Sequence, residues 1–169
     1  MNFEKVSFEA FRKDMLKCKF TEETILTAYE NIRMPKRATE YSAGYDICTP
    51  VPFTLKPGER MVIPTGIKVC FNKDEAKMWH FQLFVRSSLG VKRDIVMTNS
   101  TGIIDPDYAD NPDNEGDMLM PLYNRAYNYQ HFEAGDRIVQ GIFMLHGKAE
   151  NDDATGQRTG GVGSTDKEE

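Results

Sequence analysis

The segment TNSTGIIDPDY carries the side chains best suited to binding and hydrolysing a nucleotide. Asn99 can pair with a base edge, and Ile103 and Ile104 can lie against a sugar. Asp105 supplies a carboxylate, while Tyr108 can stack on a deoxyribose and leave no room for a 2′-hydroxyl. The letters DPDY also fit an ordinary turn with proline at its second position, so this segment alone leaves both interpretations open.

Two earlier segments contain groups that suit phosphate chemistry. VRSSLG ends an expected strand with Arg86, Ser87 and Ser88, which together offer several donors to phosphate oxygens. The alternative is a serine-capped helix start with a surface arginine. In ATEYSAGYDI, Gly44 permits close backbone approach and Asp46 follows it on a strand, although such an aspartate more often stabilises a turn.

Two later segments add a guanidinium each. AGDRIVQGIF is a turn followed by a strand, with Arg137 and Gln140 as its polar members; its alternative is a plain edge of a sheet. RTGGVGST combines Arg158 with glycines whose backbone N–H groups can wrap a triphosphate, or it is a flexible linker.

Composition limits the class of protein. A chain of 169 residues supports one domain, and 40% apolar with 28% charged residues is close to globular averages. The N-terminus MNFEKVSFEAFRKDM is too charged for a signal peptide and no apolar run is long enough for a membrane span, so we expect a cytoplasmic protein without a membrane partner. A net charge of -5 argues against nucleic-acid binding.

Cysteines and histidines are few and widely spaced. Their spacing matches neither a disulfide framework nor a zinc motif, so we expect reduced, mostly buried thiols and no metal ion held by the protein. These residues are Cys18, Cys48, Cys70, His80, His131 and His146.

Periodicity predicts the elements that position these segments. SFEAFRKDMLK has apolar residues at helical spacing after Ser7, a possible N-cap, whereas TEETILTAYENI fits a helix or a strand equally. From Met34 onward, short alternating runs such as IKVCF, MWHFQLFV and RIVQGIFML predict an all-β sandwich or barrel. We expect a helical extension over 1–30, a β domain over 31–150 and a glycine-rich, mobile arm over 151–169.

The five segments, in their order and spacing from Ile32 to Asp166, resemble the trimeric dUTPase family. The matching motifs are AGYD, RSSL, GIIDPDY, RIVQ and RTGGVGST. The resemblance implies a jelly-roll or β-clip subunit and a homotrimer whose active sites take motifs from all three chains. It also implies hydrolysis of dUTP to dUMP and pyrophosphate, with Mg²⁺ held by the substrate phosphates; the reaction lowers dUTP and supplies dUMP for thymidylate synthesis.

The resemblance also implies roles for individual residues. Asp105 orients the attacking water as general base, and Asp46 supports the site from behind the residues that touch substrate. Phosphates are held by Arg86, Ser87, Ser88 and Gln140. Uracil and deoxyribose are read by Asn99, Gly102, Ile103, Ile104, Tyr108 and the backbone near Leu119. The arm closes over the triphosphate with Arg158, Gly160, Gly161, Val162, Gly163 and Ser164.

Three features depart from the usual family pattern. The hairpin after Tyr108 is lengthened to ADNPDNEGDM, which resembles a bacterial and phage subgroup with an Asn-Pro-x-Asn-Glu-Gly insert and leaves the register at Leu119 open. Val162 stands where most members have phenylalanine, so we expect weaker closure of the arm. Asp94 replaces a glycine, and aspartate tolerates the left-handed backbone better than most residues.

Two other functions fit parts of the sequence. dCTP deaminases share the Arg-Ser-Ser strand end but use a glutamate as base in the hairpin, and here the hairpin has Glu115 only inside the insert. A regulatory role is the second alternative, because some phage dUTPases bind repressor proteins. The N-terminal helix and the acidic insert are the candidate surfaces for such a partner.

Overall fold

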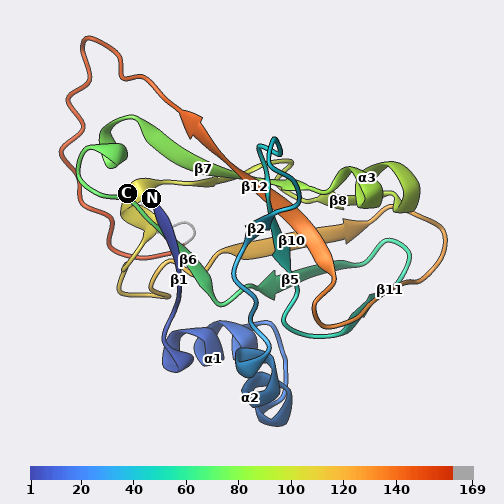
Figure 1. Cartoon of the computed structure of the whole chain (residues 1–169). Coiled ribbons are helices and arrows are strands. Elements are labelled where there is room, and N and C mark those ends of the chain that lie inside the picture. Colours follow the sequence, from blue (N-terminus) through green and yellow to red (C-terminus); the bar gives the residue numbers. More distant parts are fainter. Residues whose placement is uncertain (162–169) are drawn as a thin grey trace.

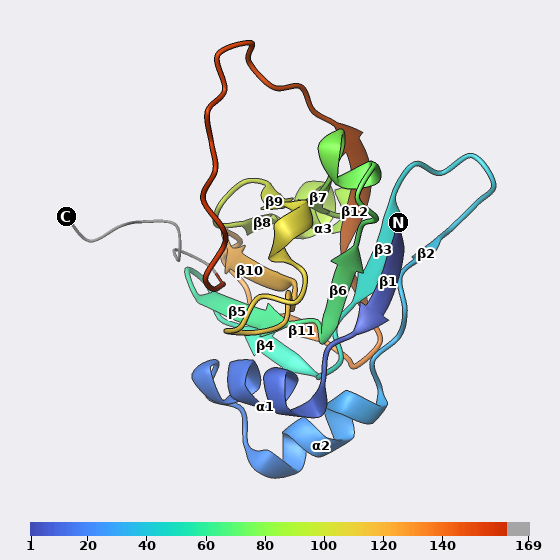
Figure 2. The same ribbon diagram turned by 90° about the vertical axis from the view of Figure 1, so that its left-hand side faces the viewer.

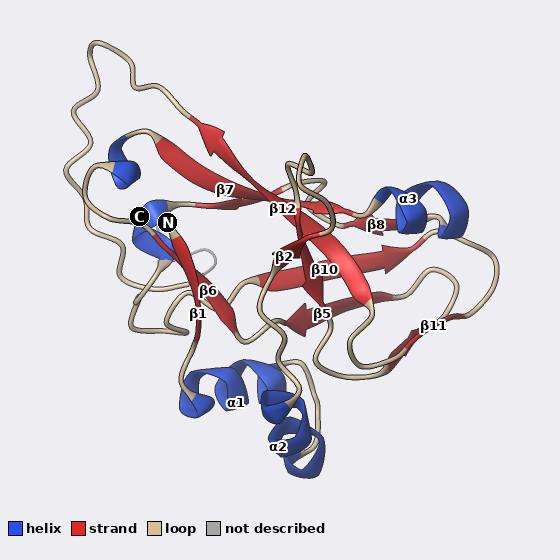
Figure 3. Cartoon of the chain, in the orientation of Figure 1, coloured by secondary structure: helices blue, strands red, loops and turns tan. Residues whose placement is uncertain are grey.

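The computed structural model describes residues 1–161, and strands predominate in it (Figures 1 and 3). Its helical elements in this range are α1 (Phe8–Lys17), α2 (Glu22–Glu30), α3 (Ser87–Arg93) and the single 3-10 turns η1 (Glu75–Lys77) and η2 (Pro106–Tyr108). Its strands are β1 (Asn2–Lys5), β2 (Lys36–Arg37), β3 (Tyr45–Cys48), β4 (Phe53–Leu55), β5 (Arg60–Pro64), β6 (Ile67–Cys70), β7 (Trp79–Val85), β8 (Ile95–Met97), β9 (Gly102–Ile104), β10 (Leu119–Asn124), β11 (Gln130–Phe132) and β12 (Arg137–Leu145).

The strands form a jelly-roll-like β fold, which confirms the predicted fold class. The largest sheet has the order β2-β3-β12-β7-β9, and a second sheet has the order β5-β10-β8. β1 pairs with β6, and β11 pairs with β4. Because β12 lies between β3 and β7, the interpretation of RIVQ as a sheet edge is wrong.

Apolar side chains from both sheets fill the space between them. Phe81 and Leu83 on β7 of the larger sheet are fully buried, as are Met120 and Leu122 on β10 of the second sheet. The pairing of β7 with β12 is so close that a Cβ on Gly141 would lie 2.0 Å from the ring of Phe81. A glycine is therefore required where the ring crosses the neighbouring strand.

Both N-terminal helices pack below the sheets (Figure 1). The predicted helix is confirmed as α1: the Ser7 hydroxyl accepts a hydrogen bond from the Ala10 N–H at 3.2 Å, and Phe11 and Met15 are fully buried. The segment TEETILTAYENI, which fitted a helix or a strand equally, forms the helix α2. Ile25 is fully buried in α2, and capping by Thr21 satisfies the N–H of Thr24.

Some local details differ from the alternatives that the sequence left open. A short helix does begin within VRSS, at Ser87, but its N-cap is Arg86 and no side chain caps it, so the serines are not capping residues. The strand before it ends at Val85, as predicted. Asp94 ends this helix in the left-handed region, with φ 49°, a conformation that aspartate tolerates better than most residues.

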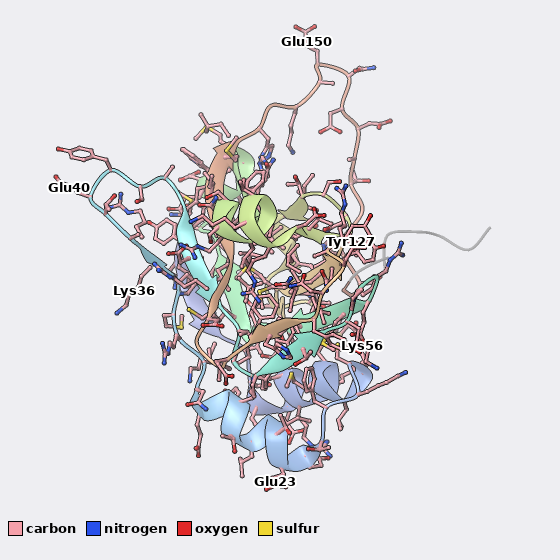
Figure 4. All side chains as sticks on the ribbon, turned by 90° about the vertical axis from the view of Figure 1, so that its right-hand side faces the viewer. Glu23, Lys36, Glu40, Lys56, Tyr127 and Glu150 are labelled. Atoms are coloured by element: carbon pink, nitrogen blue, oxygen red, sulfur yellow. The ribbon has the colours of Figure 1, made fainter. Side chains whose placement is uncertain are left out.

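After β12 the chain swings away from the sheet and returns. Glu150 lies at the outer end of this excursion (Figure 4), and the segment then runs back past β9 toward β10 and β5 (Figure 2). Within residues 1–161, no helix has the length and apolar character that crossing a bilayer requires. The three cysteines are unpaired thiols, as predicted, but they are half-buried rather than buried.

Candidate active site

A cavity of about 460 Å³ opens between β9, the start of β10 and the returning arm. This volume lies in the range of small-molecule sites, and most of the lining is apolar. The cavity brings together all six residues that the sequence assigned to base and sugar. It is lined by Val62, Leu83, Thr98, Asn99, Gly102, Ile103, Ile104, Asp105, Tyr108, Leu119, Pro121 and Arg158.

Strand alternation explains how β9 lines this cavity. Gly102 and Ile104 are buried, while Ile103 between them is 62% exposed and presents its side chain outward. β9 pairs with β7, with Gly102 opposite Leu83, and a Cβ on Gly102 would lie 3.2 Å from the Leu83 Cβ. Leu119 begins β10 and also lines the cavity, so the lengthened hairpin leaves it in the expected place.

Asp105 directly follows β9 and forms a hydrogen bond with Arg158 of the arm. The Arg158 guanidinium donates from Nη2 to Asp105 Oδ2 at 2.8 Å and from Nε to Asp107 Oδ1 at 3.0 Å. The central carbon of the guanidinium, Cζ, also lies 5.6 Å from the centre of the Tyr108 ring, within cation–π range. The arm therefore delivers a cation to the carboxylate that the sequence singled out as the base.

Tyr108 forms the buried wall of the cavity. Its hydroxyl donates to the carbonyl oxygen of Asp117 at 3.0 Å. Burial raises the pKa of Tyr108 to about 12, an effect that the hydrogen bond from Asn114 partly opposes. The phenol therefore stays neutral at ordinary pH and offers a flat ring face to a sugar.

The predicted phosphate-binding residues form a second group. The Asp46 carboxylate accepts from Arg86 Nε at 2.8 Å and from Arg137 Nη1 at 3.1 Å, so one half-buried carboxylate orients two guanidiniums. The side chain of Gln140 packs against the backbone of Gly44. A Cβ at Gly44 would lie 2.6 Å from Gln140 Oε1. The alternative of Arg86 as a plain surface cation is wrong.

This second group does not line the 460 Å³ cavity of the same chain. The predicted residues that lie outside its lining are Asp46, Arg86, Ser87, Ser88 and Gln140. Gly160 and Gly161 are buried, and a Cβ on Gly161 would lie 3.0 Å from Asp113 Oδ2. Val162, Gly163 and Ser164 lie outside the described residues, so the expectation of weaker closure at Val162 stays a prediction.

Sequence reasoning did not find several residues of the site. Val62, Thr98 and Pro121 line the cavity, and Asp107 shares Arg158 with Asp105. Asp107 was visible in DPDY, where a second acidic residue two places after Asp105 signals a site for a cation. The other three come from β5, β10 and the end of β8, and no local pattern distinguishes them from core residues.

A jelly-roll subunit with a nucleotide-sized cavity, an aspartate at its edge and two arginine groups belongs to the class of nucleotide-binding β proteins. Its sequence identifies the family. The family model described as dUTPase matches residues 30–166, which is more than half of the chain. The chain belongs to the dUTPase family.

Individual relatives agree with this assignment. The chain is 43% identical over 145 residues to the deoxyuridine 5′-triphosphate nucleotidohydrolase of Lactococcus lactis, covering 83% of this chain and 94% of that protein. Among solved structures, the dUTPase from Streptococcus mutans superposes with a TM-score of 0.68 at 31% identity, over 89% of this chain and all of the other. A dUTPase mutant from phage phi11 of S. aureus, described as coordinating a structural Mg(II) ion, shares the fold with a TM-score of 0.61 at 24% identity, over 74% of this chain and 91% of the other.

Proposed function

We propose that the protein is a dUTP diphosphatase that hydrolyses dUTP to dUMP and pyrophosphate. The observation that carries the proposal is Asp105 at the edge of an apolar, nucleotide-sized cavity, with Arg158 bonded to it at 2.8 Å. Relatives named as deoxyuridine 5′-triphosphate nucleotidohydrolases support the choice of substrate. A carboxylate next to a bound triphosphate can orient water, and the guanidinium can stabilise charge on phosphate oxygens.

In the proposed reaction, Asp105 holds a water molecule and accepts its proton as the oxygen attacks the α-phosphorus. The bond from the α-phosphorus to its bridging oxygen breaks, and pyrophosphate leaves in line. Ile103 and the backbone near Leu119 bind the base. These groups reject cytosine, because the edge of a cytosine ring would leave their donors or acceptors unpaired. The ring of Tyr108 packs against the deoxyribose.

We further propose that the active site is completed in a homotrimer. The cavity that contains Asp105 lacks the expected phosphate-binding residues Arg86, Ser87, Ser88 and Gln140 in its lining. The first three lie at the start of α3, and Gln140 lies on β12. A second copy of the chain would supply them, and a third would supply an arm. The separation of the two groups within one chain supports this arrangement.

The same proposal brings Mg²⁺ to the site with the substrate. Within residues 1–161 no three acidic, histidine or cysteine side chains are grouped as a metal site, and both Asp105 and Asp107 are bonded to Arg158. This donor set fits an ion that the phosphate chain chelates. When bound, Mg²⁺ neutralises charge on the phosphates.

dCTP deamination is disfavoured by the position of Glu115. Both of its carboxylate oxygens accept hydrogen bonds from Ser7, from the N–H at 2.8 Å and from the hydroxyl at 2.6 Å, and these bonds lower the pKa of Glu115. Glu115 does not line the cavity either. A carboxylate held in this way is a poor general base for a cytosine ring.

Incubation with dUTP, dCTP, dTTP or UTP in the presence of Mg²⁺ tests the proposal directly. We expect pyrophosphate from dUTP and no ammonia from dCTP. Asp105→Asn should lower turnover by about 10²- to 10⁴-fold, as expected for a general base, while nucleotide binding persists. Asp107→Asn, which removes the other negative charge paired with Arg158, is the matched control and should keep most turnover. Equal loss in both variants, or normal turnover of Asp105→Asn, would contradict the role of Asp105.

A further inference from the structure

The hairpin insert closes on a buried polar network centred on Asn114. This side chain is only 3% exposed, yet three oxygens lie within hydrogen-bond distance of the two N–H groups on its amide nitrogen. It lies 3.0 Å from the hydroxyl of Tyr108, 3.0 Å from Asp14 Oδ2 and 3.3 Å from the carbonyl oxygen of Asp117. A single buried amide therefore connects the N-terminal helix with the tyrosine of the cavity.

The network leaves Tyr108 little freedom. Its hydroxyl both donates to Asp117 and accepts from Asn114, and its carbonyl oxygen accepts from Asn111 Nδ2 at 2.7 Å. Asn111 also donates to Asn114 Oδ1 at 2.8 Å, so the two amides hold each other. Tyr108 is therefore held at its backbone and at its hydroxyl, and the guanidinium of Arg158 lies over one face of its ring.

α1 anchors this network from outside the region that the family model matches. Asp14 lies in α1 and is 3% exposed, and its carboxylate provides the acceptor for the amide nitrogen of the insert. Ser7 binds Glu115, and Lys13 donates to the carbonyl and the carboxylate of Asp113. Those contacts are partly or fully exposed, whereas the hydrogen bond that Asn114 donates to Asp14 is buried. Asn114 also donates to the Tyr108 hydroxyl, so one residue links Asp14 to the tyrosine.

We propose that Asn114, anchored by Asp14 of α1, is a positioning residue that fixes the Tyr108 ring and so sets discrimination against ribonucleotides. The inference rests on the proposed function. Rejection of a 2′-hydroxyl by contact requires a wall that does not yield, and a displacement of about 1 Å is enough to change such a site. A buried donor that loses its acceptor has to find another, so removal of either partner allows the ring to shift.

Three variants and a control test the inference. In Asn114→Ala and Asp14→Ala, the ratio of kcat/KM for dUTP to that for UTP should fall about five- to tenfold, the equivalent of one buried hydrogen bond. Asp14→Asn keeps an amide oxygen as acceptor and should retain the wild-type ratio. Lys13→Ala removes an exposed contact between the same helix and the same insert, and it should leave the ratio unchanged.

A ratio distinguishes positioning from loss of folded enzyme, because unfolding lowers both rates equally. Binding of the non-hydrolysable α,β-imido analogues of dUTP and UTP, measured by calorimetry, should show the same change of preference. Wild-type protein that leaves dUTP intact would overturn the proposed function, and the analogue preference would still test the network. If the alanine variants keep the wild-type ratio in both measurements, or if Lys13→Ala loses it equally, the inference is wrong.

Discussion

Asp117 makes the stability of the protein depend on pH in a predictable direction. It is fully buried, and its Oδ1 accepts hydrogen bonds from the Gly66 N–H at 2.8 Å and from the N–H and hydroxyl of Thr65 at 3.1 and 3.2 Å. Its Oδ2 has no hydrogen-bond partner among the described residues. Burial, with the nearby charge of Asp14 as a further cause, raises the pKa of Asp117 from 3.8 to about 8.

The direction in which the free energy of unfolding changes with pH follows from how many protons each state binds. Between pH values of about 4 and 8 the folded chain keeps a proton on Asp117 that the unfolded chain has lost, so the free energy of unfolding falls as pH rises. One unit of pKa difference corresponds to about 1.4 kcal/mol, so this single group should cost the fold on the order of a few kcal/mol by pH 8. The contribution of Asp117 to the free energy of unfolding is therefore most favourable below pH 3.8, the pKa of the carboxyl in the unfolded chain. It is lost as the pH rises to about 8, the pKa in the folded chain.

Asp117→Asn resembles the protonated side chain and retains an oxygen for the three bonds. We expect it to match wild type within about 1 kcal/mol near pH 5 and to exceed it by a few kcal/mol near pH 9. Urea unfolding at fixed protein concentration, at pH 5, 7 and 9, measures this difference. Asp113→Asn is the control, because Lys13 lowers the pKa of that exposed carboxyl and its effect should be constant over this range. If Asp117→Asn runs parallel to wild type from pH 5 to 9, the buried carboxyl is ionised and the reasoning fails.

Three further predictions concern the sheet, the phosphate group and the metal. Gly141→Ala places a methyl group against Phe81, and we expect a loss of at least about 1–3 kcal/mol in urea unfolding; unchanged stability would contradict the register of β7 and β12. Asp46→Ala frees Arg86 and Arg137, and steady-state kinetics should show KM for dUTP rising about tenfold, the equivalent of about one charge-assisted hydrogen bond, with a smaller change in kcat; a change confined to kcat would refute this role. Removal of Mg²⁺ with EDTA should abolish turnover yet leave the urea midpoint unchanged, whereas a midpoint that Mg²⁺ alone raises would reveal an ion held by the protein.

Much of the fold was predictable because its elements carry a local period. The alternation in WHFQLFV and the spacing in FEAFRKDMLK each identify one buried face within a few residues. α2 was ambiguous because Ile25, Leu26 and Tyr29 satisfy both periods. In the structure Thr21 caps the first turn, and Ile25 is buried while Leu26 is exposed. β1 was not predicted: NFEK is too short to show a period, and its partner β6 lies more than 60 residues away.

The site shows the same division between local and long-range information. Asp105, Tyr108 and Ile103 lie in one segment, so their common cavity follows from the motif. By contrast, His80 and His146 were interpreted as scattered, yet the pairing of β7 with β12 brings their rings to 5.4 Å. The bond from Asn114 to Asp14 spans 100 residues, and a single sequence carries no pattern that reports such a pair.

In the proposed function, the arginines are the groups that allow an acidic chain to bind a polyanion. With a net charge of -5, long-range attraction does not favour a triphosphate, so each guanidinium must be held in place before the ligand arrives. Arg158 is held by two carboxylates and a ring, and one of those carboxylates is the proposed base. Asp105 Oδ2 cannot orient water fully while it accepts from Arg158, whereas phosphate oxygens are alternative acceptors for the same donors. Transfer of Arg158 from Asp105 to the triphosphate would therefore free the base only when substrate is present, which ties the activity of Asp105 to the position of the arm.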